Sequence, residues 1–521
     1  MIEITWVEII LATWLLGTLA FSVGYCLRHY RRLRNHPPSL LLKTPYPKPN
    51  GFPMLTLDRL PSEPAMVLKK TRHRYYIALL AALASLASLF HAHPAHAIPS
   101  FSRQTSMACS SCHTSSFGPN LTPFGRKFKL DGYTQGSDDS QGPMTRGIPP
   151  LSGMLMGSFT NTQKNQEPQP TTGPSSPRFD SNNNFAMDQA SFFYGGRVYG
   201  SIGAFAQFTY DGVANIVAVD NIDLRFARGT DILGHQFDYG ISLNNSPTVS
   251  DLWNTTPAWG FPFATSPIAP SPGAGPLISG ALAQQVGGGS VYAMIDNFLY
   301  LEAGAYGDFS VSAQKNMGVW DPGNALLNGG APYWRVELQH SWDKQYVGLG
   351  TFGLDTTTYA DRFNKGSGTN QYTDLGMDLT YQYLGTMEHI FEFRASYIRE
   401  HQSLNGSQAM GAVAKSNLML NTLNLNGSYT FQQTYVGNLG FFDISGSTDP
   451  LLYADYTSYR PASQGFIAEL DYIPFGKSYG LAESFMNLRL AVQYVGYTQF
   501  DGANKAAGNN NTLFVSGWLA F

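Results

Sequence analysis

The chain has 521 residues and a formal net charge of −3, and it contains 53 glycines and 29 tyrosines. Charged residues make up 13% of it and aromatic residues another 13%. This balance excludes a disordered chain and differs from that of a cytosolic enzyme. We therefore expect a β-rich protein with much of its surface in something other than water.

A secretory signal peptide is expected over residues 66–97. A basic stretch after Met66 precedes an apolar run over 77–90, which is too short to span a bilayer. The Ala-His-Ala sequence at 95–97 is typical of a cleavage site. We therefore expect the mature chain to begin at Ile98.

Residues 1–65 contain a second export-type segment. The stretch 6–27 is apolar apart from Glu8 and is followed by four arginines, as in a membrane anchor with a basic cytoplasmic end. Because exported proteins seldom need two such signals in tandem, we interpret 1–65 as an over-extended gene start, with a real inner-membrane anchor as the alternative. The first 97 residues hold 11 of the 33 Lys and Arg but 4 of the 36 Asp and Glu, so the remainder has a net charge of −10. That charge argues against nucleic acid as a partner.

The sequence Cys109-Ser110-Ser111-Cys112-His113 carries the strongest chemical signal. Two cysteines at this spacing can bond covalently to the vinyl groups of haem while the adjacent histidine binds the iron. The alternatives are a redox-active dithiol, which usually accompanies a βαβ pattern, and half of a zinc site, which needs about four ligands. The sequence contains no second Cys-x-x-Cys, and no paired-histidine cluster follows the expected cleavage site. We therefore predict one covalent haem c held by Cys109, Cys112 and His113.

Residues 98–148 are expected to form a small α-helical c-type cytochrome segment. So short a stretch cannot build a sufficient core alone and must fold around its cofactor. Thr122 as N-cap, Pro123 at the first helical position and Gly132 as the stop signal predict a short helix.

That helix offers an aromatic face and a basic face. Phe124 and Phe128 lie four residues apart and could cover the porphyrin or close a small hydrophobic seam. Three basic residues could pair with haem propionates or form a solvated face: Arg126, Lys127 and Lys129.

Residues 149–521 alternate polar and apolar residues, as strands do when one face lies in lipid and the other in a polar lumen. In one such run, for example, Leu488 and Leu490 alternate with Arg489. A soluble β-sandwich could show the same alternation. We count about sixteen runs and expect an all-β outer-membrane barrel of about sixteen antiparallel strands, beginning near 151, 186, 200, 217, 235, 289, 298, 332, 344, 371, 387, 415, 432, 461, 484 and 511.

Met154 and Met156, in the first expected strand, are candidates for the second axial ligand of the iron. Methionine ligation raises the reduction potential, which suits a centre that accepts electrons from a weak reductant. Both share one strand face with Ser158 and Thr160, opposite Leu155. This face should line the lumen and point both methionines at a haem segment in the periplasmic end. Their alternative role is packing or lining a pore.

The connections favour a barrel over a sandwich. Those after even-numbered runs are mostly short, whereas those after odd-numbered runs are long, notably 246–287 and 308–331. Outer-membrane barrels have short periplasmic turns and long external loops. The final strand ends in Phe521, which resembles the assembly signal of such barrels, although Phe514 and Trp518 fall on the expected lumen face.

Three sequence features in this order carry a family resemblance. They are the haem motif, the stretch Leu-Thr-Pro-Phe-Gly-Arg-Lys-Phe-Lys-Leu-Asp-Gly-Tyr over 121–133, and Pro-Leu-Ser-Gly-Met over 150–154 at the start of the first strand. The segment 101–160 thus resembles the fused monohaem cytochrome–porin family of outer-membrane iron oxidases, and the barrel resembles it in architecture. The resemblance implies a sixteen-stranded porin with the cytochrome in its periplasmic mouth and one-electron oxidation of extracellular Fe(II). The three haem-binding residues carry over, but no iron-binding residue does.

The expected function is an outer-membrane electron conduit from extracellular Fe(II) to a soluble periplasmic cytochrome or another carrier, as in an iron:cytochrome oxidoreductase. Outer-membrane lipid about 30 Å thick blocks electrons as well as ions, and a haem inside a closed barrel offers a way through. Two alternatives stay open. One is a passive porin whose cytochrome segment acts as a plug or sensor, and the other is the same conduit serving another donor.

Overall fold

The computed structural model describes residues 99–136, 150–166, 179–478 and 486–521. The expected segment 1–65 and the expected signal peptide 66–97 lie outside the described residues. The same holds for residue 98 and for the end of the expected cytochrome segment, 137–148.

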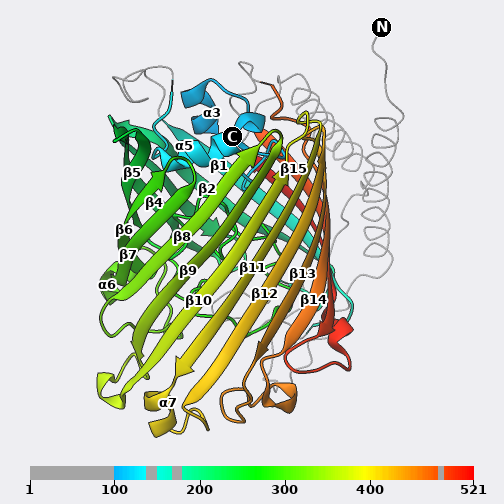
Figure 1. Cartoon of the computed structure of the whole chain (residues 1–521). Helices are drawn as coiled ribbons and strands as arrows, with labels where there is room; N and C mark the ends of the chain where they lie inside the picture. The colour runs from blue at the N-terminus through cyan, green and yellow to red at the C-terminus, as the bar shows by residue number, and fades with distance from the viewer. Residues whose placement is uncertain (1–98, 137–149, 167–178, 479–485) are drawn as a thin grey trace, which may run out of the picture. The chain divides into compact units, whose positions relative to one another are not determined.

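Sixteen antiparallel strands form one closed barrel, in which β1 pairs with β16 and every other pair consists of neighbours in the sequence (Figure 1). The strands are Leu151–Thr162 (β1), Asn184–Tyr199 (β2), Ile202–Asp211 (β3), Ile216–Ile232 (β4), His235–Asn244 (β5), Val286–Ile295 (β6), Leu299–Asp308 (β7), Ala331–Trp342 (β8), Gln345–Tyr359 (β9), Thr369–Tyr383 (β10), His389–Ser403 (β11), Asn417–Phe431 (β12), Tyr435–Gly446 (β13), Ser463–Tyr472 (β14), Asn487–Gln499 (β15) and Thr512–Ala520 (β16). The expected barrel of about sixteen antiparallel strands is confirmed, and each strand starts within three residues of its expected position. Closure leaves no strand edge unpaired.

Short turns join the strands at one end of the barrel and long loops at the other. The β8–β9 turn spans 343–344, whereas the longest loops span 245–285 and 309–330. Two connections depart from the expected asymmetry: β3–β4 spans only 212–215 on the long-loop side, and β14–β15 spans 473–486 on the short-turn side. Because β1 starts and β16 ends at the short-turn end, the segment that precedes β1 joins the barrel there (Figure 1).

The two faces of the wall follow the predicted alternation. In β1, Met154, Met156, Ser158 and Thr160 are buried toward the lumen, whereas Leu155 is 43% exposed on the outside. The same pattern puts apolar side chains on the outer face of most strands and polar or charged ones inside. An apolar outer face and a polar inner face are what lipid on one side and a lumen on the other require.

In the described part of the chain before β1, three helices lie at the short-turn end of the barrel: α3 (Pro99–Thr105), α4 (Cys109–Cys112) and α5 (Pro123–Leu130) (Figure 1). The helix expected from Pro123 is confirmed, with Thr122 Oγ1 accepting a hydrogen bond of 3.2 Å from Gly125 N and Gly132 at φ +66° after its end. None of the helices in the described ranges is long and apolar enough to cross a bilayer.

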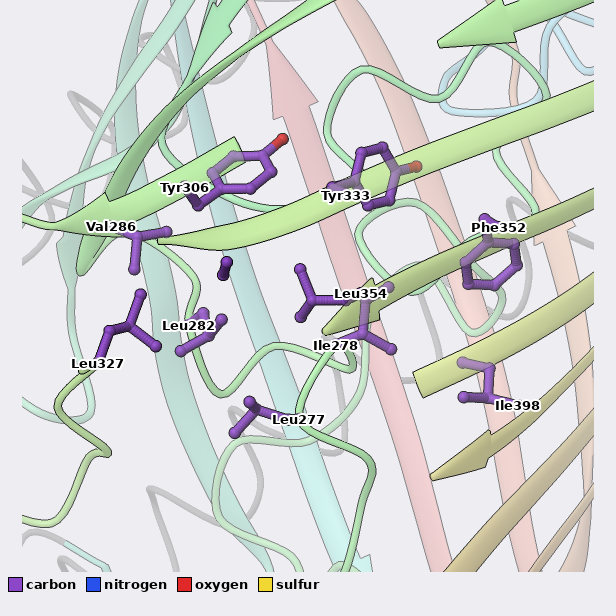
Figure 2. Packing of buried hydrophobic residues seen from close by; sticks show 11 residues of the cluster. Leu277, Ile278, Leu282, Val286, Tyr306, Leu327, Tyr333, Phe352, Leu354 and Ile398 are labelled. Carbon is purple, nitrogen blue, oxygen red and sulfur yellow. The ribbon is translucent and has the colours of Figure 1, made fainter. Parts of the chain in front are cut away.

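The loop between β5 and β6, residues 245–285, folds inward and fills the middle of the lumen. Its side chains Leu277, Ile278 and Leu282 are at most 8% exposed and pack against the wall (Figure 2). Their wall partners come from β7, β8, β9 and β11: Tyr306, Tyr333, Phe352, Leu354 and Ile398. Burying one such aliphatic side chain contributes roughly 1.5–3 kcal/mol, so this cluster holds the loop in place.

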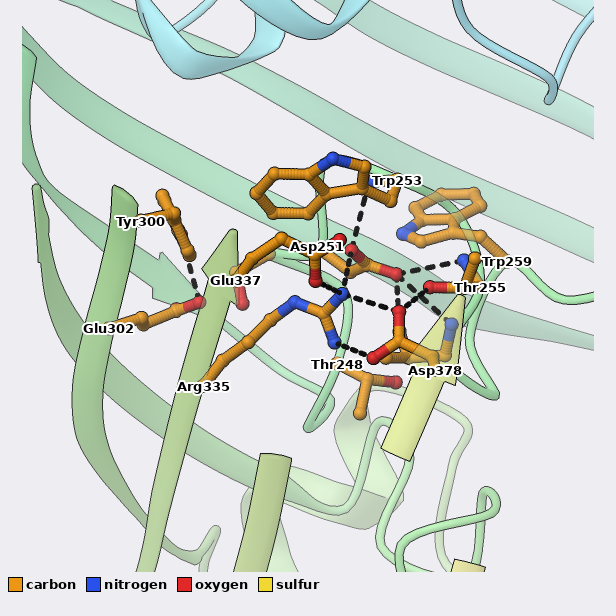
Figure 3. Close-up of polar contacts among 12 residues, drawn as sticks. Thr248, Asp251, Trp253, Thr255, Trp259, Tyr300, Glu302, Arg335, Glu337 and Asp378 are labelled. Atoms are coloured by element: carbon orange, nitrogen blue, oxygen red, sulfur yellow. Dashed lines mark hydrogen bonds and ion pairs between the residues drawn. The ribbon is translucent and has the colours of Figure 1, made fainter. Parts of the chain in front are cut away.

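A buried ionic cluster joins the same loop to the wall (Figure 3). Arg335 of β8 is fully buried and contacts three carboxylates, at 2.7 Å from Glu337, 2.7 Å from Asp378 and 3.5 Å from Asp251 of the loop. Thr255, also of the loop, donates a hydrogen bond to Asp378. Removing one partner of such a buried cluster leaves an uncompensated charge. The loss of folding stability is then larger than the net stability that the ion pair contributes.

Candidate functional site

The Cys-x-x-Cys-His sequence folds into one helical turn, α4, followed by extended backbone. The N–H of His113 donates to the carbonyl of Cys109 at 2.9 Å and closes this turn. Residues three apart lie on one face of a helical turn, so the turn directs Cys109 and Cys112 to the same side. Burial, and after it the neighbouring Cys109, raises the pKa of the Cys112 thiol to about 12.

Both cysteines and His113 line a cavity of about 430 Å³ inside the short-turn end of the barrel. Its wall is mostly apolar and comes from three parts of the chain. The N-terminal segment supplies Phe101, Met107, Phe117, Gly125 and Phe128, the inner loop supplies Trp259, Pro262 and Phe263, and the strands supply Met154, Phe193, Phe205 and Trp518. Cavities of roughly 300–1,000 Å³ with mostly apolar walls are the usual sites of cofactors and other small molecules.

The His113 imidazole is held in one tautomer by the backbone. Its Nδ1 lies 3.2 Å from the carbonyl oxygen of Asn120, and since that oxygen can only accept, Nδ1 carries the proton. Burial lowers the pKa of His113 to about 4, although the bond to Asn120 opposes the shift. The ring is therefore neutral, with Nε2 left unprotonated. Iron-binding histidines need this form.

The loop around His113 is anchored to the wall by Glu392 of β11. Oε2 of Glu392 accepts hydrogen bonds from Thr114 Oγ1 at 2.8 Å and from Asn120 Nδ2 at 3.0 Å. Its Oε1 accepts from Gln382 at 2.7 Å and from Arg394 at 2.9 Å. One buried carboxylate thus ties two residues that follow His113 to the barrel.

Helix α5 closes the cavity on the side of Cys112. A Cβ added at Gly125 would lie 2.2 Å from the carbonyl oxygen of Cys112, so only glycine permits this approach. Phe128 is 4% exposed and lines the cavity. Phe124, for which covering the porphyrin was one of two alternatives, is not among the cavity residues.

The basic residues of α5 hold the segment to its surroundings. Arg126 lies over the ring of Tyr346 at 3.7 Å and donates to Gln382 at 2.9 Å. Lys129 donates to the carbonyl oxygens of Val249 and Asp251 of the inner loop. Since both are buried, a solvated face, one of the two alternatives for these residues, is wrong for them. Half-exposed Lys127 pairs with Asp131 and Asp238 instead.

The structure brings one of the two candidate methionines to the cavity. Met154 lines it, together with Cys109, Cys112 and His113. Met156 is also buried in the lumen, but it is not among the cavity residues, and its sulfur lies 3.7 Å from Gln189 Nε2. The position of Trp518 on the lumen face of β16 is explained by the same cavity. Trp518 lines this cavity and packs edge-on against Phe117, with the ring centroids 5.3 Å apart.

These residues fit a c-type haem. Two thiols and a neutral imidazole meet in one apolar cavity, and a thioether lines it. Sequence reasoning missed Asn120, Glu392 and Trp259, because no local pattern signals that wall and loop residues meet the motif. In the described ranges, no group of three or more His, Cys, Asp or Glu side chains is arranged to hold a bare metal ion.

By its fold the protein belongs to the class of closed, sixteen-stranded antiparallel β-barrels. No protein-family model and no curated protein matches the chain. Similar solved structures include the outer-membrane channel DcaP of Acinetobacter baumannii, with 11% identity and a TM-score of 0.38 over 71% of this chain and 96% of that one. Others are OprB of Pseudomonas putida, with 10% identity and 0.40 over 71% and 94%, and OmpT of Vibrio cholerae, with 11% identity and 0.36 over 74% and 99%.

Proposed function

We propose that the chain is an outer-membrane protein that oxidises extracellular Fe(II) with one covalently bound haem c and passes the electron to a soluble periplasmic cytochrome or another carrier. The observation that carries this proposal is the meeting of Cys109, Cys112, His113 and Met154 in one cavity inside a closed barrel. In this reading residues 66–97 export the chain, 98–148 form the cytochrome segment and 149–521 form the barrel.

Each of these residues has a defined task. The two thiols would attach the haem through thioether bonds, and Nε2 of His113 and the sulfur of Met154 would bind its iron. Bound there, haem supplies a one-electron centre that alternates between ferric and ferrous iron. Asn120 orients the imidazole through its carbonyl at 3.2 Å. Apolar side chains around the cavity limit the access of water, which raises the potential of a haem centre.

The barrel would act as an insulating sheath across the membrane. Its strands have 9 to 17 residues, enough for the roughly 9–11 that a tilted strand needs to cross the hydrocarbon core. Their outer face is apolar, which suits lipid. Short turns are periplasmic in outer-membrane barrels, so the cysteine segment would lie at the periplasmic mouth. An electron carrier could reach it from that side.

Absorption spectroscopy of the purified full-length protein tests the proposal. We expect a c-type haem spectrum that Fe(II) reduces, and covalent haem staining of the denatured chain. Cys112→Ala should abolish the staining and iron oxidation by intact cells. Absence of covalent haem in protein from a host able to attach it would contradict the proposal. Rapid reduction by another donor, with none by Fe(II), would favour the same conduit with a different substrate.

A passive porin is the second candidate, because a closed barrel with a polar inner wall is the architecture of a channel. In the described residues, however, the inner loop and the N-terminal segment occupy the lumen. Liposome swelling separates the two functions. A porin should pass small sugars at a rate that depends on their size, whereas the proposed conduit should leave the liposomes osmotically tight.

A further inference from the structure

A second chamber lies in the lumen beside the candidate haem cavity. It has a volume of about 310 Å³ and lies between the inner loop and strands β11 to β14. Four loop residues line both cavities and form the partition between them: Asn254, Pro257, Gly260 and Pro262. Asn424 of β12 is exposed on the lumen side of the chamber, so water reaches it. We call this space the Arg394 chamber.

The chamber contains a buried cation with unused donors. Arg394 of β11 is 5% exposed and lines the chamber. Its Nη2 donates to Glu392, but Nε and Nη1 have no partner among the residues that the structure describes. A buried donor without a partner costs about 1–3 kcal/mol, and more when it is charged. Arg394 therefore gains from an acceptor that enters the chamber.

The charge of the surroundings favours an anion at this point. Of the described residues that line the chamber, Arg394 is the one with a charge. Two carboxylates that hydrogen-bond lining residues of the chamber also have other partners: Glu392 accepts from Thr114 and Asn120, and Asp378 accepts from Arg335 as well as from the lining residue Thr255. These contacts reduce their competition for the free donors of Arg394.

The chemistry of the wall selects the kind of anion. The free Nε and Nη1 lie on different edges of the guanidinium group, so a small anion accepts from one of them and its remaining oxygens can accept from other donors of the chamber wall. Ser396 and Asn424 add neutral hydrogen-bonding groups to the lining. The volume admits a small organic acid as well as an inorganic ion.

We propose that the Arg394 chamber binds a small oxyanion, a carboxylate, sulfate or phosphate, by a charge-assisted hydrogen bond to Nε or Nη1 of Arg394. Binding at this site needs no haem, so its test is independent of the proposed function. If a haem is present behind the partition, the bound anion adds negative charge next to it.

Calorimetric titration of the full-length protein in detergent, at constant ionic strength, tests the site with sodium sulfate, sodium phosphate and sodium acetate, and with sodium chloride as comparator. We expect one oxyanion to bind per chain and chloride to bind more weakly. Arg394→Gln should weaken oxyanion binding roughly 10- to 100-fold, which is the effect of losing a charged hydrogen-bond donor. The sulfate and phosphate arms against the acetate arm distinguish inorganic from organic ligands.

Two further variants keep the test decisive. Ser396→Leu fills the chamber while keeping Arg394 and should likewise weaken oxyanion binding. Arg489→Gln is the matched control, because Arg489 is a lumen arginine with the same 5% exposure whose donors are engaged by Glu469 and Asp471. It should bind as the wild type does. Unchanged affinity in folded Arg394→Gln or Ser396→Leu protein, no oxyanion binding to the wild type, or equal binding of chloride would each overturn the proposal.

Discussion

The side-chain amide of Asn120 donates a hydrogen bond of 3.0 Å to Oε2 of Glu392, across a separation of 272 residues. The backbone carbonyl of the same Asn120 accepts from Nδ1 of His113 at 3.2 Å. One residue thus links the candidate iron ligand to the barrel wall. The wall, and not the motif alone, therefore determines where the imidazole lies.

Replacement of Glu392 should loosen this link. Glu392→Ala leaves the donors of Thr114, Asn120 and Arg394 without an acceptor, at about 1–3 kcal/mol for each buried group. We expect lower thermal stability and an altered haem spectrum. Glu388→Ala, at an exposed turn next to the same strand, is the control and should change neither. A wild-type spectrum in Glu392→Ala would show that the wall does not position His113.

The two methionines of β1 should behave differently. Met154→Leu removes the thioether that lines the cavity, so the midpoint potential should fall by on the order of 0.1 V, within the roughly 0.8 V that axial ligands control. Met156→Leu should leave the potential unchanged, because Met156 lies outside the cavity lining. Spectroelectrochemical titration measures both. A drop in Met156→Leu alone would reverse the assignment.

Gly125→Ala should prevent haem attachment. The added Cβ would lie 2.2 Å from the carbonyl oxygen of Cys112, so α5 or the Cys-x-x-Cys turn must shift. Gly427→Ala is the control, since a Cβ there meets nothing within 4 Å. Haem staining of both variants after equal expression provides the comparison, and full staining of Gly125→Ala would contradict the expected close packing.

Breaking the cluster around Arg335 should release the inner loop. Arg335→Met leaves the carboxylates of Asp251, Glu337 and Asp378 buried without their cation, at a cost of about 3–5 kcal/mol. We expect a lower midpoint of urea unfolding and a higher ion conductance in planar bilayers. Arg228→Met, at an exposed end of β4, should alter neither. Conductance equal to that of the wild type would show that the loop is held by its apolar contacts.

Asp449 should make the long loops acid-sensitive. Its carboxylate accepts from the backbone N–H groups of Ala414, Lys415, Leu451 and Leu452, at 2.8–3.0 Å. Burial alone would raise the pKa of Asp449, but these bonds outweigh burial and hold the pKa below its usual 3.8. The unfolded loop therefore binds the proton at a higher pH than the folded one, so the stabilisation is present above 3.8 and is lost as the pH falls below it.

Proteolysis of intact cells measures this effect. Asp449→Asn should be cleaved faster in the loops at neutral pH and should lose the acid dependence. The wild type should become equally sensitive only in strong acid, with an acid-stable protease as reagent. The same cleavage also tests whether the long-loop end faces outward.

Most of the wall was predictable from the sequence. In β1 and β15 the alternation of polar and apolar residues predicts which side chains face the outside of the barrel. The lengths of the connections predict which end of the barrel each one lies at. Both predictions need only residues that are close together in the sequence. The cap formed by Thr122 and the turn at Gly132 were predictable for the same reason. The lengths of the β14–β15 and β3–β4 connections were not predictable, because no sequence pattern requires every connection at one end of a barrel to have a similar length.

The contents of the lumen were not predictable. Residues 245–285 read as a long external loop, yet their packing against Tyr306 and Phe352 puts them inside. From the sequence, Lys129 and Arg126 could lie on a solvated face. In the structure both are buried, because Arg126 bonds Gln382 of β10 and Lys129 bonds Val249 of the inner loop. In the sequence, Trp518 departs from the alternation expected of the last strand, but in the structure it lines the same cavity as Cys109, Cys112 and His113.

The sequence by itself determined that the chain forms a many-stranded barrel and that Cys109, Cys112 and His113 form one chemical unit, because alternation and spacing are properties of adjacent residues. Only the tertiary structure decided that Met154 and not Met156 lines the same cavity as that unit, that Glu392 anchors the loop after His113, and that Arg394 lines a separate chamber. Those relations join residues far apart in the sequence, up to 278 positions in the bond between Thr114 and Glu392. They exist only once closure of the barrel has brought β1, β11 and the inner loop around one lumen.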